Sequence, residues 1–326
     1  MSERIERAPI KFKPYLKSVS WGGDRICKFK GIEQPEPRIG ESWEISAMEG
    51  CESTVAEGRY MGMTIRELID QFGTDFLGSD VVERYGNDFP LLIKFIDAHD
   101  NLSVQVHPND ELAAKRHGGR GKTEMWYIID SEKDARIYVG LNAPMDPEEY
   151  GRRVAENSFF EMLAEHNPAP EDVFFLPAGR VHAIGAGNFL AEILQASDIT
   201  YRIYDYNRRD EDGNYRELHT ELAKDAIDFK VYPDYKMPYL PDDKDDCELI
   251  SCEHFISRRI LVDGQKEFHL DPSSFSALMC VKGEVDILYP EGRMKLKEGN
   301  TVLIPAIMKQ FLLKGKGTIL SVRSGK

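Results

Sequence analysis

The chain has 326 residues, of which 41% are apolar and 30% charged, so it can bury a sizeable core without disulfides and is not a disordered protein. Its 42 basic and 56 acidic residues give a formal net charge of −14. Because nucleic acid and anionic membranes attract cationic surfaces, this balance argues against both as partners, whereas a few local cations are enough to bind a small anionic substrate.

The apolar runs and the cysteines give no indication of membrane insertion or secretion. The longest apolar run, near residues 302–308, is interrupted by Pro305 and is far shorter than the roughly 18 residues of a transmembrane helix. The first residues lack the apolar core of a signal peptide. The 5 cysteines form no CxxC pair, and free thiols are typical of a reducing compartment. We therefore expect a cytoplasmic protein.

Most of the chain reads as short β-strands separated by Gly, Pro, Asn and Asp. Runs this short and this frequent are typical of a β-sandwich or a β-barrel. The clearest predicted strands are residues 91–96, 102–106, 125–129, 136–139, 173–176, 189–194 and 200–204.

A few helices are predicted between these strands. Thr64 and Glu67 form a capping box before an apolar helix face that ends at Gly73. Asp146 and Pro147 have the residue types of an N-cap and a first helical position. Two further helices are expected, a short one from residue 158 and another over residues 217–229.

Two distant segments have the same pattern. Residues 171–184 (EDVFFLPAGRVHAI) and 298–312 (EGNTVLIPAIMKQFL) each contain a turn, an apolar strand, Pro-Ala and a second strand. A repeated unit of this kind predicts two related β-barrels. Without gaps, His182 aligns with Gln310, and Glu124 falls near Ser276. We therefore expect one functional barrel and one that has lost its polar site.

The pattern resembles the cupins, for which PAGxxH at 177–182 and Gly283 are marks. We predict a mainly β fold with two cupin-like β-barrels of the jelly-roll type and a few short helices packed outside. Residues 232–246 combine prolines with acidic residues and read as a linker or crossing loop. We therefore expect a metal-binding catalytic domain over 1–235 and a degenerate second cupin-like domain, without metal ligands, over 236–326.

Four polar residues of the first copy are candidate metal ligands. Gln105 and His107 are two apart on a predicted strand, so they share a face, and Pro108 ends that strand. Glu124 begins another strand and His182 follows the Pro-Ala-Gly turn. Two imidazoles, a carboxylate and an amide oxygen suit zinc with an open position, although residue types alone leave iron, cobalt and manganese open.

Beyond the cupin pattern, several runs closely resemble type I mannose-6-phosphate isomerases in their shorter bacterial form. Weaker matches are WGG (21–23), GESWE (40–44) and RELH (216–219). The strongest runs are PLLIKFIDA (90–98), LSVQVHP (102–108), GKTEMWY (121–127), PAGRVHAIG (177–185) and SDITYRIYD (197–205). The resemblance implies interconversion of D-mannose 6-phosphate and D-fructose 6-phosphate through a metal-stabilised cis-enediol(ate).

The same resemblance implies roles for individual residues. It implies one Zn²⁺ per chain, bound by Gln105, His107, Glu124 and His182. It makes Arg202 the active-site arginine, and it places Lys122 beside the substrate and Lys94 and Ser103 near the pocket floor. Longer family members carry a His-Lys-Pro-Glu run, whereas Gly121 and Thr123 flank Lys122 here. A ring-opening role assigned to that histidine therefore does not transfer.

The proton-transfer base is open between four residues. Lys122 and Glu192 rank first, ahead of Asp198 and His99. For the substrate phosphate, the candidate cations are Arg180, Lys122 and Arg202.

Two other functions remain open from the residues: a metal-dependent cupin oxygenase, and a non-catalytic cupin that binds sugar phosphate. The expected partner is a small sugar phosphate, and we expect a monomer or weak homodimer.

Overall fold

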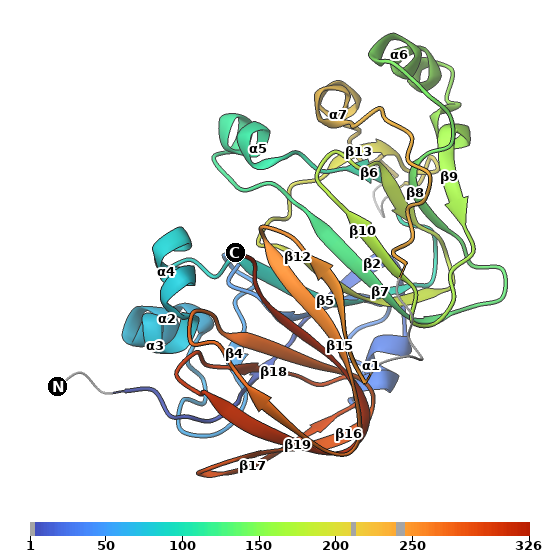
Figure 1. Cartoon of the computed structure of the whole chain (residues 1–326). Helices are drawn as coiled ribbons and strands as arrows, with labels where there is room; N and C mark the ends of the chain where they lie inside the picture. The colour runs from blue at the N-terminus through green and yellow to red at the C-terminus, as the bar shows by residue number, and fades with distance from the viewer. Residues whose placement is uncertain (1–3, 210–212, 239–244) are drawn as a thin grey trace.

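Within residues 4–209, 213–238 and 245–326, which the computed structural model describes, the strands form three antiparallel sheets (Figure 1). The six-stranded sheet has the order β10 (Val173–Leu176), β7 (Glu124–Ser131), β12 (Asn188–Gln195), β5 (Leu91–Ala98), β3 (Ile39–Ile45) and β2 (Tyr15–Gly23). The five-stranded sheet has the order β13 (Tyr201–Tyr204), β6 (Val104–Val106), β11 (His182–Ile184), β8 (Ile137–Leu141) and β9 (Leu163–His166).

These two sheets face each other and enclose one apolar core. Trp126 and Leu190 from the larger sheet pack in one buried cluster with Ile137, Val139 and Ile184 from the smaller one. Two open sheets packed face to face form a jelly roll, and this confirms the predicted mainly β cupin fold. Within the part of the chain that is described, the hydrogen-bonded sheets are not closed into continuous barrels.

The third sheet forms the carboxyl-terminal part of the molecule. Its order is β14 (Asp246–Ser251), β15 (Phe255–His269), β19 (Gln310–Ser324), β16 (Ser276–Tyr289), β18 (Thr301–Ile304), β1 (Ile10–Lys13) and β4 (Thr54–Val55), with β17 (Gly292–Lys297) paired to β16. Two of its strands, β1 and β4, come from the amino-terminal part of the chain. The amino-terminal residues therefore contribute to the carboxyl-terminal sheet. The division of the chain near residue 235 stays a prediction.

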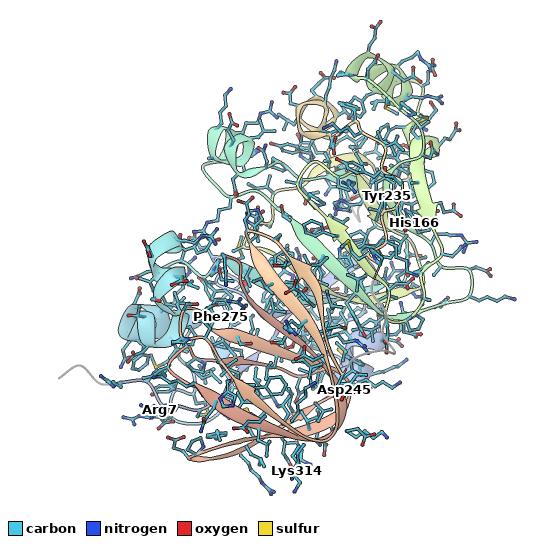
Figure 2. All side chains as sticks on the ribbon, in the orientation of Figure 1. Arg7, His166, Tyr235, Asp245, Phe275 and Lys314 are labelled. Carbon is cyan, nitrogen blue, oxygen red and sulfur yellow. The ribbon has the colours of Figure 1, made fainter. Side chains whose placement is uncertain are left out.

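Strands β5 and β12 are buried on both faces, which explains why their sequences are apolar almost throughout. One face lines the jelly roll, while the other packs with the third sheet and with the helices α2 (Ile65–Phe72), α3 (Thr74–Leu77) and α4 (Ser79–Tyr85). Phe275 lies between these helices and the third sheet (Figure 2), with its ring centroid 4.8 Å from that of Phe89.

The helices lie outside the sheets. Three of them, α5 (Asp110–His117), α6 (Pro147–Ala155) and α7 (Thr220–Ala226), cover the outer face of the five-stranded sheet (Figure 1). The helix α1 (Arg25–Lys30) follows β2. The capping box of Thr64 and Glu67 and the start at Asp146 are confirmed. The predicted third helix is instead a single 3₁₀ turn, η1 (Phe159–Met162).

The segment after α7 crosses the first jelly roll before the chain enters the third sheet. Tyr235 is buried beside His166 (Figure 2), with ring centroids 5.8 Å apart, and its hydroxyl donates to the Leu141 carbonyl over 2.9 Å. The predicted linker over residues 232–246 is therefore a packed crossing segment up to residue 238. Its residues 239–244 lie outside the described part of the chain. No described helix combines the length and the apolar composition that crossing a bilayer requires.

Candidate active site and metal centre

Three buried side chains meet where strands of the two facing sheets begin or end. Glu124 is the first residue of β7, His182 is the first of β11, and His107 directly follows β6. Their ligand atoms all lie within 4.8 Å of one another. The Glu124 carboxylate is central, because its Oε2 lies 3.4 Å from His107 Nε2 and its Oε1 lies 3.3 Å from His182 Nε2. The structure thus gathers three of the four predicted ligands into one metal-sized cluster.

Each imidazole is oriented by the backbone. The Nδ1–H of His107 donates to the Ile199 carbonyl over 2.9 Å, and that of His182 donates to the Arg180 carbonyl over 2.8 Å. A carbonyl can only accept, so Nδ1 carries the proton and the Nε2 lone pair of each ring faces Glu124. Metal-binding histidines are held in this way by a second hydrogen bond.

Several atoms of the cluster have unused bonding capacity. Among the described residues, His107 Nε2 and both carboxylate oxygens of Glu124 are buried without a hydrogen-bond partner. A buried polar atom without a partner costs free energy, and a buried carboxylate costs most. A divalent cation bound to these three atoms would remove that cost, so the residues fit a metal ion.

The protonation states favour metal binding as well. Burial lowers the pKa of His107 to about 3 and also lowers the pKa of His182, so both rings are neutral near pH 7. Burial alone would raise the pKa of Glu124, but the nearby Lys122 ammonium holds it well below its usual range. The cluster therefore presents two neutral imidazoles and one carboxylate.

Gln105 is the fourth predicted ligand and lies directly across from His182 in the β6–β11 pair. Its Nε2 is 3.2 Å from His182 Nε2, so the amide N–H donates to the ring nitrogen. Rotation of the amide by 180° would bring its oxygen to the same place. After that rotation Gln105 would add an amide oxygen to the two imidazoles and the carboxylate, a set that suits a borderline divalent ion.

A row of polar side chains crosses the inner face of the six-stranded sheet. Trp43, Lys94, Glu192 and Trp126 are consecutive cross-strand partners on β3, β5, β12 and β7. Lys94 Nζ lies 3.3 Å from Glu192 Oε2, and Trp126 Nε1 donates to Glu192 Oε1 over 3.0 Å. Since Leu194 pairs with Glu124 two residues beyond Glu192, this row lies next to the metal-sized cluster.

Glu41 was not among the predicted site residues but belongs to this row. Its Oε2 accepts from Lys94 Nζ over 3.2 Å and from Trp43 Nε1 over 2.7 Å. Against the opposing effect of burial, Lys94 and Lys17 lower the pKa of Glu41 to about 2. Burial, and then Glu124, raise the pKa of Glu192. Lys94 thus contacts two carboxyls whose pKa values are shifted in opposite directions, that of Glu41 downward and that of Glu192 upward.

Lys122 reaches the cluster from the segment that follows α5. Its buried side chain places Nζ 3.4 Å from Glu124 Oε2. Arg202 is the cross-strand partner of Gln105, and its Nη1 donates to the Glu217 carbonyl over 2.8 Å. Burial, and then Arg216, lower the pKa of Arg202. Ser103 is buried directly before β6.

The remaining candidates lie in other surroundings. The guanidinium of Arg180 stacks on the crossing segment, 4.2 Å from the ring centroid of Tyr232 and 5.0 Å from that of Tyr235. Asp198 is exposed. His99 is exposed just after β5, at the end of that strand opposite to the one near Glu124. The structure brings together the ligands, Lys122, Glu192 and Lys94, and it does not bring Asp198 or His99 to them.

Comparisons with known proteins agree with this architecture. Residues 10–138 match the family model "Phosphomannose isomerase type I, catalytic domain", and residues 245–324 match "Mannose-6-phosphate isomerase, cupin domain". The mannose-6-phosphate isomerase ManA of Bacillus subtilis is 36% identical over 94% of this chain and 96% of its own. The chain belongs to the type I phosphomannose isomerase family.

Other relatives extend the same similarity. The mannose-6-phosphate isomerase of Streptococcus mutans is 30% identical over 98% of this chain and 99% of its own. The crystal structure of a Bacillus subtilis mannose 6-phosphate isomerase superposes with a TM-score of 0.88 at 31% identity, covering 96% of this chain and 99% of that one. A putative mannosephosphate isomerase from Archaeoglobus fulgidus, at 24% identity and TM-score 0.81, shares the fold over 98% of both chains.

The second copy of the repeat in this phosphomannose isomerase family member has the same strand pairing but different side chains. Leu176 pairs with Glu124 between β10 and β7, and Ile304 pairs with Ser276 between β18 and β16, each just before a Pro-Ala. Ser276 thus occupies the position of Glu124, and Gln310, exposed at the start of β19, that of His182. This register supports the alignment of the two copies, and the expectation that the second copy lacks metal ligands stays a prediction.

Substitutions at these two equivalent positions should have unequal effects. We expect His182→Ala to abolish high-affinity divalent-metal binding and at least 99% of isomerase activity, a loss of about 3 kcal/mol or more. Gln310→Ala should leave both nearly unchanged. Metal content after dialysis and initial rates on mannose 6-phosphate measure the two effects. Similar losses in both variants would contradict the assignment of the site to the first jelly roll.

The carboxylate of Glu41 should contribute to acid stability. A carboxyl with a lowered folded-state pKa stabilises the protein above its unfolded value, and the contribution is lost as the pH falls through the folded value. For Glu41 that window runs from about pH 4.5 down to about 2. We expect Glu41→Gln to reduce the fall in the free energy of unfolding across this window, measured by urea titration. The exposed Glu83→Gln is the control, and an unchanged pH profile in Glu41→Gln would contradict the prediction.

Proposed function

We propose that this chain is a metal-dependent mannose-6-phosphate isomerase that interconverts D-mannose 6-phosphate and D-fructose 6-phosphate. The observation that carries this proposal is the buried cluster of His107, Glu124 and His182, whose ligand atoms converge beside Glu192 and Lys122. Family membership favours this reaction over the oxygenase and the non-catalytic binding module.

The ligand set proposed for the metal is Gln105, His107, Glu124 and His182, and zinc is the ion we expect. No thiolate takes part, and the reaction needs no change of oxidation state, which suits zinc. When bound, a divalent cation at this site supplies Lewis-acid stabilisation of the negative charge that develops on the substrate oxygens. One ion per chain is expected, since the second copy has serine and glutamine at two ligand positions.

The reaction moves a proton between two adjacent carbons, and we assign this transfer to Glu192. Its carboxyl lies in the jelly roll next to the cluster, held by Trp126 and Lys94. Burial, and then Glu124, raise the pKa of this carboxyl above its ordinary value, which makes it a stronger base than an exposed carboxylate. In the open-chain aldose the proton taken from C2 would be returned to C1, and the hydroxyl proton of O2 would pass to O1, giving the ketose through a cis-enediol.

Cationic groups would stabilise the charge that this transfer creates. Lys122 reaches Glu124 at the cluster, and Arg202 lies across the β6–β13 pair from Gln105. We propose that both residues stabilise this charge and that Lys122 also contacts the substrate. Lys94 and Ser103 would line the floor of the pocket. Each such contact is typically worth a factor of about 10²–10³ in rate.

Substrate phosphate requires local cations in this acidic chain, and Lys122 and Arg202 are the proposed ones. Arg180 remains a predicted phosphate ligand, although its guanidinium stacks on Tyr232 and would have to leave that ring to reach the substrate. We also propose a cytoplasmic location, supported by the five cysteines, all of which are free thiols. A monomer or weak homodimer stays a prediction.

Metal removal tests the function directly. Purified chain should convert mannose 6-phosphate to fructose 6-phosphate in a coupled assay, lose more than 99% of its rate after chelation, and recover with one equivalent of zinc per chain. The physical reason is that, without the metal, only Lys122 and Arg202 would stabilise the negative charge of the enediolate. Full turnover by protein verified as metal-free would refute the proposal, and oxygen uptake that depends on iron would favour the oxygenase.

Isotope exchange tests the identity of the base. In D₂O, a base that exchanges its proton with solvent during turnover leaves deuterium on the product. We expect Glu192→Gln, which keeps the Trp126 hydrogen bond, to lower kcat by about 10²–10⁴ and to abolish deuterium incorporation. Lys122→Met should also slow turnover but retain the incorporation that accompanies each conversion. The reverse pattern would assign the base to Lys122.

A further inference from the structure

Lys122 lies in an irregular segment between α5 and β7, yet its backbone is held as firmly as that of a strand. The three successive amide groups of residues 121–123 each donate to a different acceptor. Gly121 N–H donates to Asp110 Oδ1 over 2.7 Å, Lys122 N–H to the Pro108 carbonyl over 3.1 Å, and Thr123 N–H to Gln195 Oε1 over 2.8 Å. Three consecutive hydrogen bonds in an irregular segment restrict the position of the Lys122 backbone.

Gln195 connects two of these three contacts. Besides accepting from Thr123 N–H, its own backbone N–H donates to the Thr123 carbonyl over 3.1 Å. Its Nε2 donates to Asp110 Oδ1 over 3.0 Å, the same oxygen that accepts from Gly121. Gln195 is buried at the end of β12, three residues beyond Glu192. Gln195 and Asp110 therefore form one hydrogen-bonded pair, which we call the Lys122 clamp.

Close packing supports the same interpretation. A Cβ on Gly121 would lie 2.6 Å from the backbone of Asn109 and Asp110, which is too close for any side chain. The segment thus approaches the start of α5 as tightly as a glycine allows. On the other side, the Thr123 hydroxyl accepts from Ala178 N–H over 3.3 Å, in the turn that precedes His182.

We propose that Gln195 and Asp110 are positioning residues that hold Lys122 in its working place beside Glu124. This inference rests on the proposed function, in which Lys122 contacts the substrate. A lysine has four rotatable side-chain bonds, so an error at its backbone is carried to Nζ, and a displacement of about 1 Å in an active site can cost roughly a hundredfold in rate. Neither Gln195 nor Asp110 contacts the candidate ligands through its own side chain, so the pair acts through Lys122.

A double-mutant cycle tests the proposal. We expect Gln195→Ala to lower kcat/KM by about ten- to a hundredfold. If Lys122→Met acts on kcat, Gln195→Ala should act on kcat too, and likewise for KM. In the Lys122→Met background, Gln195→Ala should cause no further loss, because there is no lysine left to position. Asp110→Ala should behave like Gln195→Ala in both backgrounds. Asp110→Asn keeps an oxygen acceptor and should retain most of the activity.

Asn188 supplies a matched control at the opposite end of the same strand. It is a fully buried amide whose Nδ2 donates to the carbonyls of Arg136 and Gly185. Asn188→Ala should lower the free energy of unfolding without changing the kcat/KM of the folded enzyme. Equal fractional losses from Gln195→Ala in the wild-type and Lys122→Met backgrounds would show a general structural role and overturn the proposal.

Hydrogen exchange gives a readout that does not depend on turnover. A peptide covering residues 118–124 should exchange faster in Gln195→Ala than in wild type, and it should be unaffected in Asn188→Ala. Unchanged exchange in Gln195→Ala would overturn the clamp even if activity fell. If the wild-type chain proved inactive on mannose 6-phosphate, the proposed function would fail, while the exchange measurement would still decide whether the clamp orders the Lys122 segment.

Discussion

The rest of the site depends on the complete burial of one carboxylate, that of Glu124. Removing a carboxylate from water costs several kcal/mol even after the protein relaxes, and neutral imidazoles alone do not repay that cost. In this chain Lys122 offsets part of that cost, and a cation held by Glu124, His107 and His182 would offset the rest. The buried charge thus demands a cation at its centre, and the orientation of both rings by backbone carbonyls prepares the place for one.

The ends of three strands position the side chains of the metal-sized cluster. β7 and β11 begin with Glu124 and His182, whereas β6 ends just before His107, where Pro108 lacks the N–H that would continue the pairing. The side chains at these three ends therefore meet in one buried cluster. The polar row from Trp43 to Trp126 lies on the same sheet as Glu124, so Glu192 and Lys94 are neighbours of the cluster.

From the sequence alone, features that depend on neighbouring residues could be predicted, whereas features that depend on pairing between distant segments could not. The strand over residues 173–176 and the capping box at Thr64 follow from neighbouring residues, and both are confirmed. α5 has only a weak apolar face, which is why it was not predicted. Glu41 lies in the GESWE run and Gln195 in no motif, and neither could be assigned to the site because their contacts arise only when β3 lies beside β5 and β12 ends beside the Lys122 segment. The addition of β1 to the carboxyl-terminal sheet is equally non-local.

The second jelly-roll copy supports the first through packing contacts. It packs against the outer face of β7, where Ser257 donates to the sulfur of Met125, the residue next to Glu124. Arg259, almost fully buried, lies 3.4 Å from Glu171 just before β10. Because β1 and β4 of the first half join the third sheet, the two halves cannot separate without breaking strand pairs. The second copy therefore packs behind the strand that begins with Glu124 and supports it from the side opposite to the jelly-roll core.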